Sequence, residues 1–249
     1  IMGMGELHLE VYLERMKREF NAVIEAGAPK VSFRETISKR VEFDYTHKKQ
    51  TGGSGQYGRI KGYFEPDDNG EFVFESKVVG GNIPTEYIPA VEKGFREMMS
   101  KGAYIGSPVQ GLKVVLQDGA YHNVDSSDKA FQSAAKGCFR QNYTKGAPSV
   151  LEPLMLVSVE GPSEFQGDII GTIMQRRGIN VGTTEDDGFI RVDANVPLAE
   201  MFGYATVLRS STQGKAEFTM EFAKYAPAPA EVAEELVKEY AEKKAAGNN

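Results

Sequence analysis

The order of elements expected between residues 154 and 222 restricts the fold more than any other feature of the sequence. Apolar residues at a spacing of two predict strands, and apolar residues three and four apart predict helices. In chain order these segments are strand 154–160, helix 163–177, strands 179–184 and 189–196, helix 198–211 and strand 216–222. Gly178 is expected to be the C′ residue of the first helix. The resulting βαββαβ order is that of a ferredoxin-like domain.

The middle of the chain predicts a different order of elements. The alternation from Val31 to Phe43 indicates one long strand, and the turn Asp67–Gly70 predicts that the next two strands pair as a hairpin. The other segments are strands 59–65, 71–79 and 109–116 and helices 85–101 and 126–143. We therefore expect a central βββαβα domain with an unusual crossover. The chain as a whole is then a multidomain protein of the α+β or α/β class.

The two ends of the sequence predict smaller pieces. A helix at 6–20 and a strand at 21–26 bury too little surface to stand alone, so we interpret them as the remnant of a domain that continues upstream. Pro227 and Pro229 precede an amphipathic tail helix with five Glu and three Lys. The expected divisions of the chain are 1–29, 30–152, 153–226 and 227–249.

Composition narrows the functional classes. Over 249 residues, 29 Lys+Arg against 35 Asp+Glu give a net charge of −6, which excludes a uniformly basic nucleic-acid coat but not local basic patches. The segment 44–62 carries +3 and the segment 129–145 carries +4. Cys138 is the single cysteine, so an internal disulfide is excluded and a reducing cytoplasm is expected. No apolar run approaches the length of a membrane span.

Two loops are rich in hydrogen-bonding groups and poor in apolar anchors. The segment 51–58 has four glycines in eight residues, and each costs roughly 1 kcal/mol relative to Ala when it is ordered. The segment 119–127 places His122 between Tyr121 and Asn123, after a hydrophobic strand and before a helix cap, so the imidazole is expected to point outward. Together the loops predict a recognition tip.

Motifs for catalysis are missing from the sequence. No G-x-x-x-x-G-K-[ST] phosphate loop occurs, since Gly214-Lys215 is followed by Ala216. Three scattered histidines and one cysteine do not make a zinc site. We therefore expect no catalytic, cofactor-binding or metal-binding residue and no enzyme activity in this chain. The alternative is an enzyme that uses the glycine loop as a phosphate site, but that loop leads into a strand instead of a helix N-terminus.

Five separated runs resemble translation elongation factor G, in order and over essentially the whole chain. They are residues 3–10 (GMGELHLE), 51–58 (TGGSGQYG), 83–91 (IPTEYIPAV), 121–127 (YHNVDSS) and 196–206 (VPLAEMFGYAT). Ser54 stands where many family members carry a basic residue. With the segment 44–49, it favours a mitochondrial-like or second bacterial paralogue.

The resemblance implies the end of domain III followed by domains IV and V of a ribosomal GTPase. The implied activity is translocation, in which the tip of domain IV enters the decoding site. The partners would be both ribosomal subunits, transfer RNA and messenger RNA, and the protein would be monomeric. GTP and magnesium would bind in an N-terminal part outside this chain, so that the parent protein hydrolyses GTP. A paralogue specialised for ribosome recycling is the alternative within the family.

The resemblance also assigns site residues. RNA contacts in the decoding site fall on Gly52, Gly53, Ser54, Gly55, Gln56, Tyr57, Gly58, His122, Asn123, Val124 and Asp125. The supporting basic residues are Lys48, Lys49, Arg59, Lys61, Arg176 and Arg177. For the last two, favourable interaction with the end of their own helix is a sufficient alternative explanation.

Overall fold

A computed structural model of the chain describes residues 6–23, 31–50 and 55–246. The chain divides into two compact units. One, the ferredoxin-like unit, comprises residues 1–32 and 152–226, and the other, the four-stranded unit, comprises residues 33–151 and 227–249. Within the described residues, no helix is both long and apolar enough to cross a membrane.

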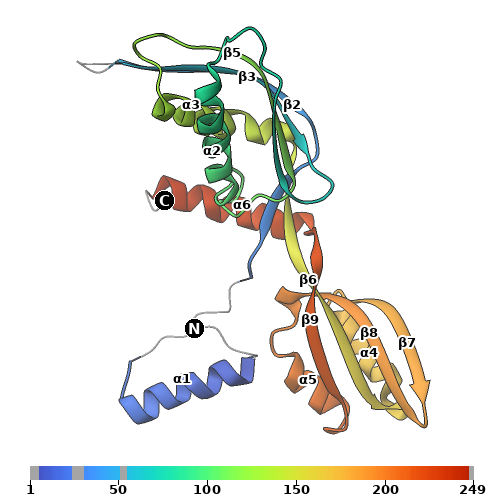
Figure 1. Cartoon of the computed structure of the whole chain (residues 1–249). Coiled ribbons are helices and arrows are strands. Elements are labelled where there is room, and N and C mark those ends of the chain that lie inside the picture. The colour runs from blue at the N-terminus through green and yellow to red at the C-terminus, as the bar shows by residue number, and fades with distance from the viewer. Residues whose placement is uncertain (1–5, 24–30, 51–54, 247–249) are drawn as a thin grey trace. The chain divides into compact units, whose positions relative to one another are not determined.

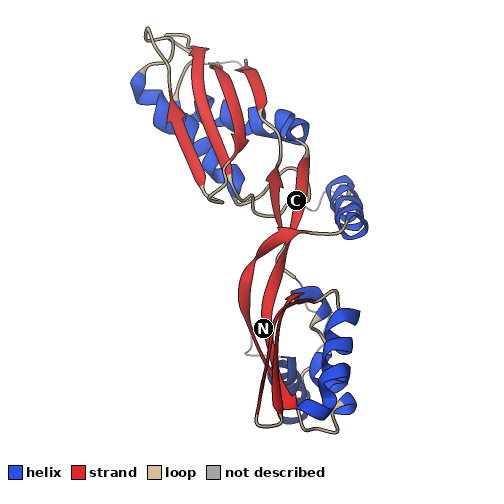
Figure 2. Cartoon of the chain, turned by 90° about the vertical axis from the view of Figure 1, so that its right-hand side faces the viewer, coloured by secondary structure: helices blue, strands red, loops and turns tan. Residues whose placement is uncertain are grey.

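The four-stranded unit consists of a sheet with two helices, α2 and α3, on one face (Figures 1 and 2). The strand order is β2-β3-β5-β4, and only the β4–β5 pair in this sheet is parallel. The described elements of the unit are β1 (Arg34–Ile37), β2 (Val41–Lys49), β3 (Gln56–Pro66), β4 (Phe72–Ser76), a 3-10 turn (Thr85–Tyr87), α2 (Ile88–Met99), β5 (Leu112–Ala120), α3 (Asp128–Asn142), a second 3-10 turn (Tyr143–Gly146) and α6 (Ala230–Ala245).

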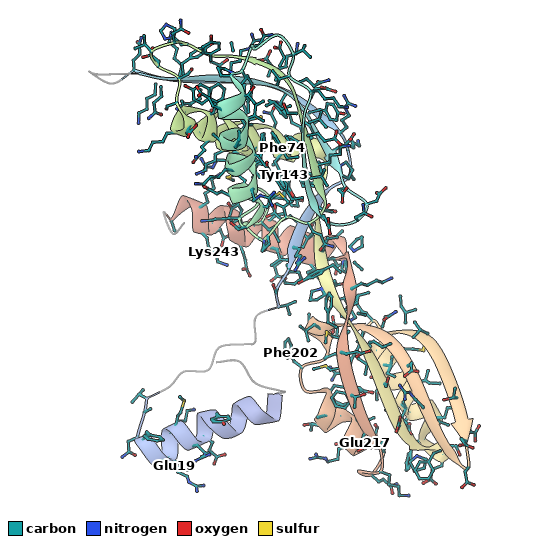
Figure 3. The ribbon with its side chains drawn as sticks, in the orientation of Figure 1. Glu19, Phe74, Tyr143, Phe202, Glu217 and Lys243 are labelled. Carbon is teal, nitrogen blue, oxygen red and sulfur yellow. The ribbon has the colours of Figure 1, made fainter. Side chains whose placement is uncertain are left out.

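Aromatic rings fill the space between this sheet and its helices. Phe43 of β2 lies 5.9 Å from the ring of Phe64 and 5.8 Å from that of Phe95, and all three side chains are buried. Such rings contribute both buried area and favourable ring contacts. Tyr143 is also fully buried in this unit (Figure 3). The packing holds β2 and β3 against α3, whose N-terminus follows the second predicted loop.

Two sequence predictions for this unit were wrong. The long strand from Val31 to Phe43 is broken, because the amides of Ser38 and Lys39 donate to the carbonyl of Gly146, and β1 pairs with β6 while β2 pairs with β3. The predicted hairpin also does not form. Asp67 Oδ2 accepts from the amides of Asn69 and Glu71, so the turn is satisfied locally, and β5 inserts between β3 and β4.

The ferredoxin-like unit has the predicted βαββαβ order. Its sheet runs β7-β8-β6-β9, and the apolar faces of α4 and α5 cover one side (Figure 1). The elements are β6 (Pro148–Pro162), a 3-10 turn (Ser163–Phe165), α4 (Gln166–Gln175), β7 (Ile179–Asp186), β8 (Phe189–Pro197), a 3-10 turn (Leu198–Glu200), α5 (Tyr204–Ser211) and β9 (Glu217–Pro227). The first residues of β6 lie in the four-stranded unit, where they pair with β1.

One helix end in this unit differs from the prediction. The left-handed residue after α4 is Arg177, with φ of 58°, and not Gly178. Glycine is nevertheless required at 178, because a Cβ there would collide with the side chain of Ile173. The glycine therefore serves close packing, and the backbone reversal falls one residue earlier.

The ends of the chain agree in part with expectation. The predicted first helix is α1 (Glu6–Phe20). Of the strand predicted at 21–26, residues 21–23 are not in a strand and residues 24–26 lie outside the described residues. The predicted tail helix is α6, and the ring of Tyr240 lies against Gly106 of the four-stranded unit. The division of the chain at 29, 152 and 226 remains a prediction.

Candidate functional site

The structure brings the two predicted loops together at one end of the four-stranded sheet. The amide of Tyr57 donates to the carbonyl of Asp125 at 2.8 Å, and the amide of Gly55 donates to the Asp125 carboxylate at 3.0 Å. Ser126 Oγ donates to the carbonyl of Tyr57 at 2.8 Å. We call residues 55–58 and 121–127 the tip. Thr51, Gly52, Gly53 and Ser54 lie outside the described residues.

The tip hydrogen bonds follow from the strand geometry. Strands β2 and β3 form an antiparallel hairpin in which Lys49 is paired with Gln56. Strand β5 lies beside β3, and Arg59 is paired with Ala120, so the segment after β5 must pass next to residues 55–57. Ser127 then caps α3, because its hydroxyl accepts from the amide of Ala130.

His122 is held by its own loop and faces solvent. Its side chain is 57% exposed, and its Nδ1 accepts from the amides of Val124 at 3.4 Å and Asp125 at 3.3 Å. The same Nδ1 lies 3.4 Å from a carboxylate oxygen of Asp125. The ring of Tyr57 stands edge-on, with centroids 6.4 Å apart. In the part of the chain that the structure describes, Nε2 has no hydrogen-bond partner. The outward imidazole predicted from the sequence is confirmed.

Gln56 is fixed by a residue to which sequence reasoning gave no role of its own. His47 Nε2 lies 3.0 Å from Gln56 Oε1. The two side chains come from opposite strands of the β2–β3 hairpin, where His47 pairs with Gly58 and Lys49 pairs with Gln56. The alternation of β2 places His47 on the same side as Phe43. The contact could have been found only with the register across the turn, because nothing in the local sequence reports it.

The described glycines of the first loop have internal reasons for being glycine. A Cβ on Gly55 would lie 3.1 Å from Cγ of Asp125, and a Cβ on Gly58 would lie 3.3 Å from Cδ1 of Phe131. Both are tighter than ordinary van der Waals contacts. Close approach within the protein is therefore sufficient to explain these two positions. The RNA contacts that the resemblance assigns to these two glycines remain a prediction.

Other tip residues extend the exposed surface. Val124 is 74% exposed and Tyr121 is 43% exposed, and Asn123 is also exposed. An exposed Val at the end of a loop has no packing role in the fold. It leaves an apolar edge beside the polar groups of His122 and Asn123.

The basic residues near the tip differ in how they are paired. Lys48, Lys49 and Lys61 are exposed. The guanidinium of Arg59 forms two hydrogen bonds with the carboxylate of Asp44, at 2.8 and 2.6 Å, and this contact lowers the pKa of Asp44. In the second basic segment, Lys136 forms an ion pair with Glu97. The +3 of segment 44–62 already counts Asp44 and is not reduced by the pair with Arg59, whereas the +4 of segment 129–145 is partly balanced by Glu97.

Arg176 and Arg177 belong to the ferredoxin-like unit and are bound inside it. Arg177 makes two hydrogen bonds of 2.9 Å to the carboxylate of Glu152, which is only 5% exposed, and a third of 3.0 Å to Glu200. Arg176 donates to the carbonyls of Glu200 and Phe202 and lies over the ring of Tyr204. These contacts give both residues a structural role, and RNA contact by either remains a prediction.

The remaining chemistry is structural. Burial raises the pKa of the Cys138 thiol, which keeps it protonated and unreactive. Among the described side chains, no group of three or more His, Cys, Asp or Glu could hold a metal ion. The described part of the glycine loop runs into β3, and not into a helix.

Comparison with known proteins gives a consistent result along the chain. Three family models match in succession, namely Elongation Factor G, domain III, at residues 1–28, Elongation factor G, domain IV, at 29–147, and Elongation factor G C-terminus at 149–236. The chain is 59% identical over 247 residues to Elongation factor G 2 of Anaeromyxobacter dehalogenans, covering 99% of this chain and 35% of that protein. It is 58% identical over 246 residues to Elongation factor G 1 of Treponema pallidum, with the same coverage.

A solved structure shares the fold. A crystal structure of a protein from Thermus thermophilus superposes with a TM-score of 0.87 at 40% identity, covering 96% of this chain and 36% of that one. The fold and the matches define a chain of the translation elongation factor class. It belongs to the elongation factor G family and spans about a third of the length of the curated relatives named above. The models that it matches are those of domain III, domain IV and the C-terminus.

Proposed function

We propose that this chain is the part of a ribosomal translocase that inserts the tip of domain IV into the decoding site and so promotes movement of transfer RNA and messenger RNA. The observation that carries the proposal is the tip itself. Its two loops are bound to each other through Asp125 and Ser126, while the imidazole edge of His122 remains exposed. A site that is ordered before its partner arrives loses less entropy on binding.

The chemistry of the tip suits RNA. The RNA minor groove is wide and shallow and displays 2′-hydroxyls and base edges, which hydrogen-bonding side chains on a narrow loop can reach. Lys48, Lys49 and Lys61 add attraction over a Debye length of about 8 Å at physiological salt. Both ribosomal subunits, transfer RNA and messenger RNA are the proposed partners, and we propose a monomer that acts in the cytoplasm. GTP and magnesium would act in a part of the protein outside this chain.

The test uses a chimera in which this chain replaces the matching residues of a full-length relative. Single-round translocation and ribosomal subunit splitting are measured separately with the same preparation. We expect translocation to exceed the rate without factor, with GTP hydrolysis dependent on the relative's domains and not on this chain alone. Activity in splitting only would favour the recycling paralogue instead. Micromolar binding of GTP to the isolated 249-residue chain would revive the phosphate-site enzyme.

A further inference from the structure

Residues 102–107, in the connection between α2 and β5, are folded around a carboxylate that the proposed function does not use. Glu35 is fully buried, and its carboxylate accepts three backbone N–H groups of this loop. The donors are Tyr104 at 3.1 Å, Ile105 at 2.8 Å and Ser107 at 3.0 Å. Backbone N–H groups that converge in this way form an anion-binding nest. In this loop, which we call the nest loop, the protein supplies the anion itself.

The backbone of β1 holds Glu35 in this position. The amide of Glu35 donates to the carbonyl of Pro108 at 2.9 Å, and its carbonyl accepts from the amide of Gln110 at 2.8 Å. The nest loop is closed by the amide of Gly102, which donates to the carbonyl of Ser107 at 2.8 Å. A Cβ on Gly102 would collide with the carboxylate of Glu35. Glycine at this position therefore leaves the space that the carboxylate fills.

The nest loop also contacts the C-terminal helix α6. Gly106 has φ of 75°, a backbone conformation that glycine adopts without strain. A Cβ there would collide with the ring of Tyr240 in α6. The two neighbours of Gly106, Ile105 and Ser107, are the residues whose amides bind one oxygen of Glu35. The surface on which Tyr240 rests is therefore shaped from the other side by the carboxylate.

Other attachments of α6 are weak. None of its residues is fully buried, and one face is half-buried, at Val232, Ala233, Leu236, Val237 and Tyr240. Among the described residues, no hydrogen bond or ion pair joins a side chain of α6 to another element, since the pair of Lys243 with Glu239 is internal. Before the helix, the amide of Ala228 donates to the carbonyl of Val150 at 2.9 Å. A helix of 16 residues is marginal in water by itself, so α6 needs its contact with the nest loop.

We infer that Glu35 is the positioning residue for α6, because its carboxylate shapes the nest loop and the nest loop presents Gly106 as the seat of Tyr240. Loss of the carboxylate would release α6 by local unfolding while the rest of the four-stranded unit stays folded. The chain enters α6 directly from β9, so docking of α6 also fixes the end of the chain that leaves the ferredoxin-like unit. The helix is thus a strap whose attachment one buried side chain controls. This inference is independent of the proposed function.

Chemical rescue of Glu35→Ala tests the need for an anion, on the full 249-residue chain. Hydrogen exchange of the α6 amides, measured by NMR, should quicken about tenfold, the equivalent of one lost hydrogen bond. Added formate should restore slow exchange, because its two oxygens can accept from the same N–H groups. Formamide has the same shape without the charge and should not. A defect in α6 that formate does not reverse would refute the nest.

Two further variants keep this test interpretable. Glu71→Ala removes an exposed carboxylate of the same unit and should leave exchange in α6 unchanged, with or without formate. Glu35→Gln retains the length and shape of the side chain. It should quicken exchange in the nest loop and in α6 but not in β3. Uniformly faster exchange in β3, α2 and α6 would mean that Glu35 supports the whole unit and does not position α6.

The direction of the coupling is tested from the other side of the contact. Tyr240→Ala should quicken exchange in α6 as Glu35→Gln does, while the amides of the nest loop keep their protection. Adding Tyr240→Ala to Glu35→Gln should quicken exchange in α6 little further, because both act through one contact. Glu234→Ala, at an exposed position of α6, is the matched control. Lost protection of the nest loop in Tyr240→Ala, or fully additive effects on α6, would overturn the inference.

Discussion

The tip and the C-terminal end of α4 both carry polar side chains that the sequence assigned to RNA, but their hydrogen-bonding groups point to different partners. At the end of α4, Arg177 directs its guanidinium at Glu152 and Glu200. At the tip, the backbone amides and Asp125 make the internal contacts, and one edge of His122 remains exposed. Residue type alone does not mark a binding site. The atoms left unused by the fold are the better guide.

The largest expected effect is the loss of stability when Arg177, at the C-terminal end of α4, is replaced. Arg177→Ala would leave the carboxylate of Glu152 buried without its bidentate partner, and removing one member of such a pair costs about 3 kcal/mol. Urea unfolding followed by amide NMR signals of residues 152–226 measures the loss. Arg191→Ala is the control, because Arg191 is half exposed and solvent screens its ion pairs, so the loss should be much smaller than for Arg177→Ala. A small loss of unfolding free energy in Arg177→Ala would mean that the fold does not depend on Arg177, and would favour a role in RNA contact.

Within the four-stranded unit, the buried carboxylate of Glu35 can be compared with the carboxylate of Asp125 at the tip. Glu35 is fully buried and accepts from the amides of Tyr104, Ile105 and Ser107, much as Asp125 accepts from Gly55. Glu35→Gln would turn an amide NH₂ toward these N–H groups, and we expect a loss of about 2 kcal/mol in unfolding free energy. Circular dichroism in urea measures it. A neutral effect would mean that the carboxylate does not order residues 104–107.

The pH dependence of stability follows from the same residue. Burial is the largest influence and raises the pKa of Glu35 above 4.5, although the backbone hydrogen bonds oppose it. The folded state then binds this proton more tightly than the unfolded state, so the contribution of Glu35 to stability falls as pH rises from about 4.5 through the raised pKa. The difference in unfolding free energy between the wild type and Glu35→Gln should shrink over that range. A difference that grows with pH would contradict the shift.

The contact between the tip loops predicts a smaller effect. Asp125→Ala removes the acceptor for the Gly55 amide in a half-buried site, which should cost about 1 kcal/mol. Hydrogen exchange at the Gly55 amide should quicken, while exchange in α2 stays unchanged. Asn123→Ala, in the same loop and exposed, is the control and should alter stability by less than about 0.5 kcal/mol. Unchanged protection at Gly55 would show that Asp125 does not hold the two loops together.

Local sequence patterns predicted the elements of the ferredoxin-like unit, and their βαββαβ order is that of a known motif, although only β7 and β8 pair with a neighbour along the chain. The same reasoning was wrong about the pairing of β3 and β4, since a strand from residues 112–120 inserts between them and no local signal reports an insertion from so far away. The two loops of the tip were predicted from composition. The contact between His47 and Gln56 was not, because it depends on register across a hairpin.

The central claim is that the exposed edge of His122 acts on RNA and not on the fold, and His122→Ala tests it most directly. The isolated chain should lose no more than about 0.5 kcal/mol of unfolding free energy, the usual range for a surface site. In the chimera, single-round translocation should slow while GTP hydrolysis on the ribosome stays near normal. Translocation at an unchanged rate, or a slow rate accompanied by a large loss of stability, would contradict the account.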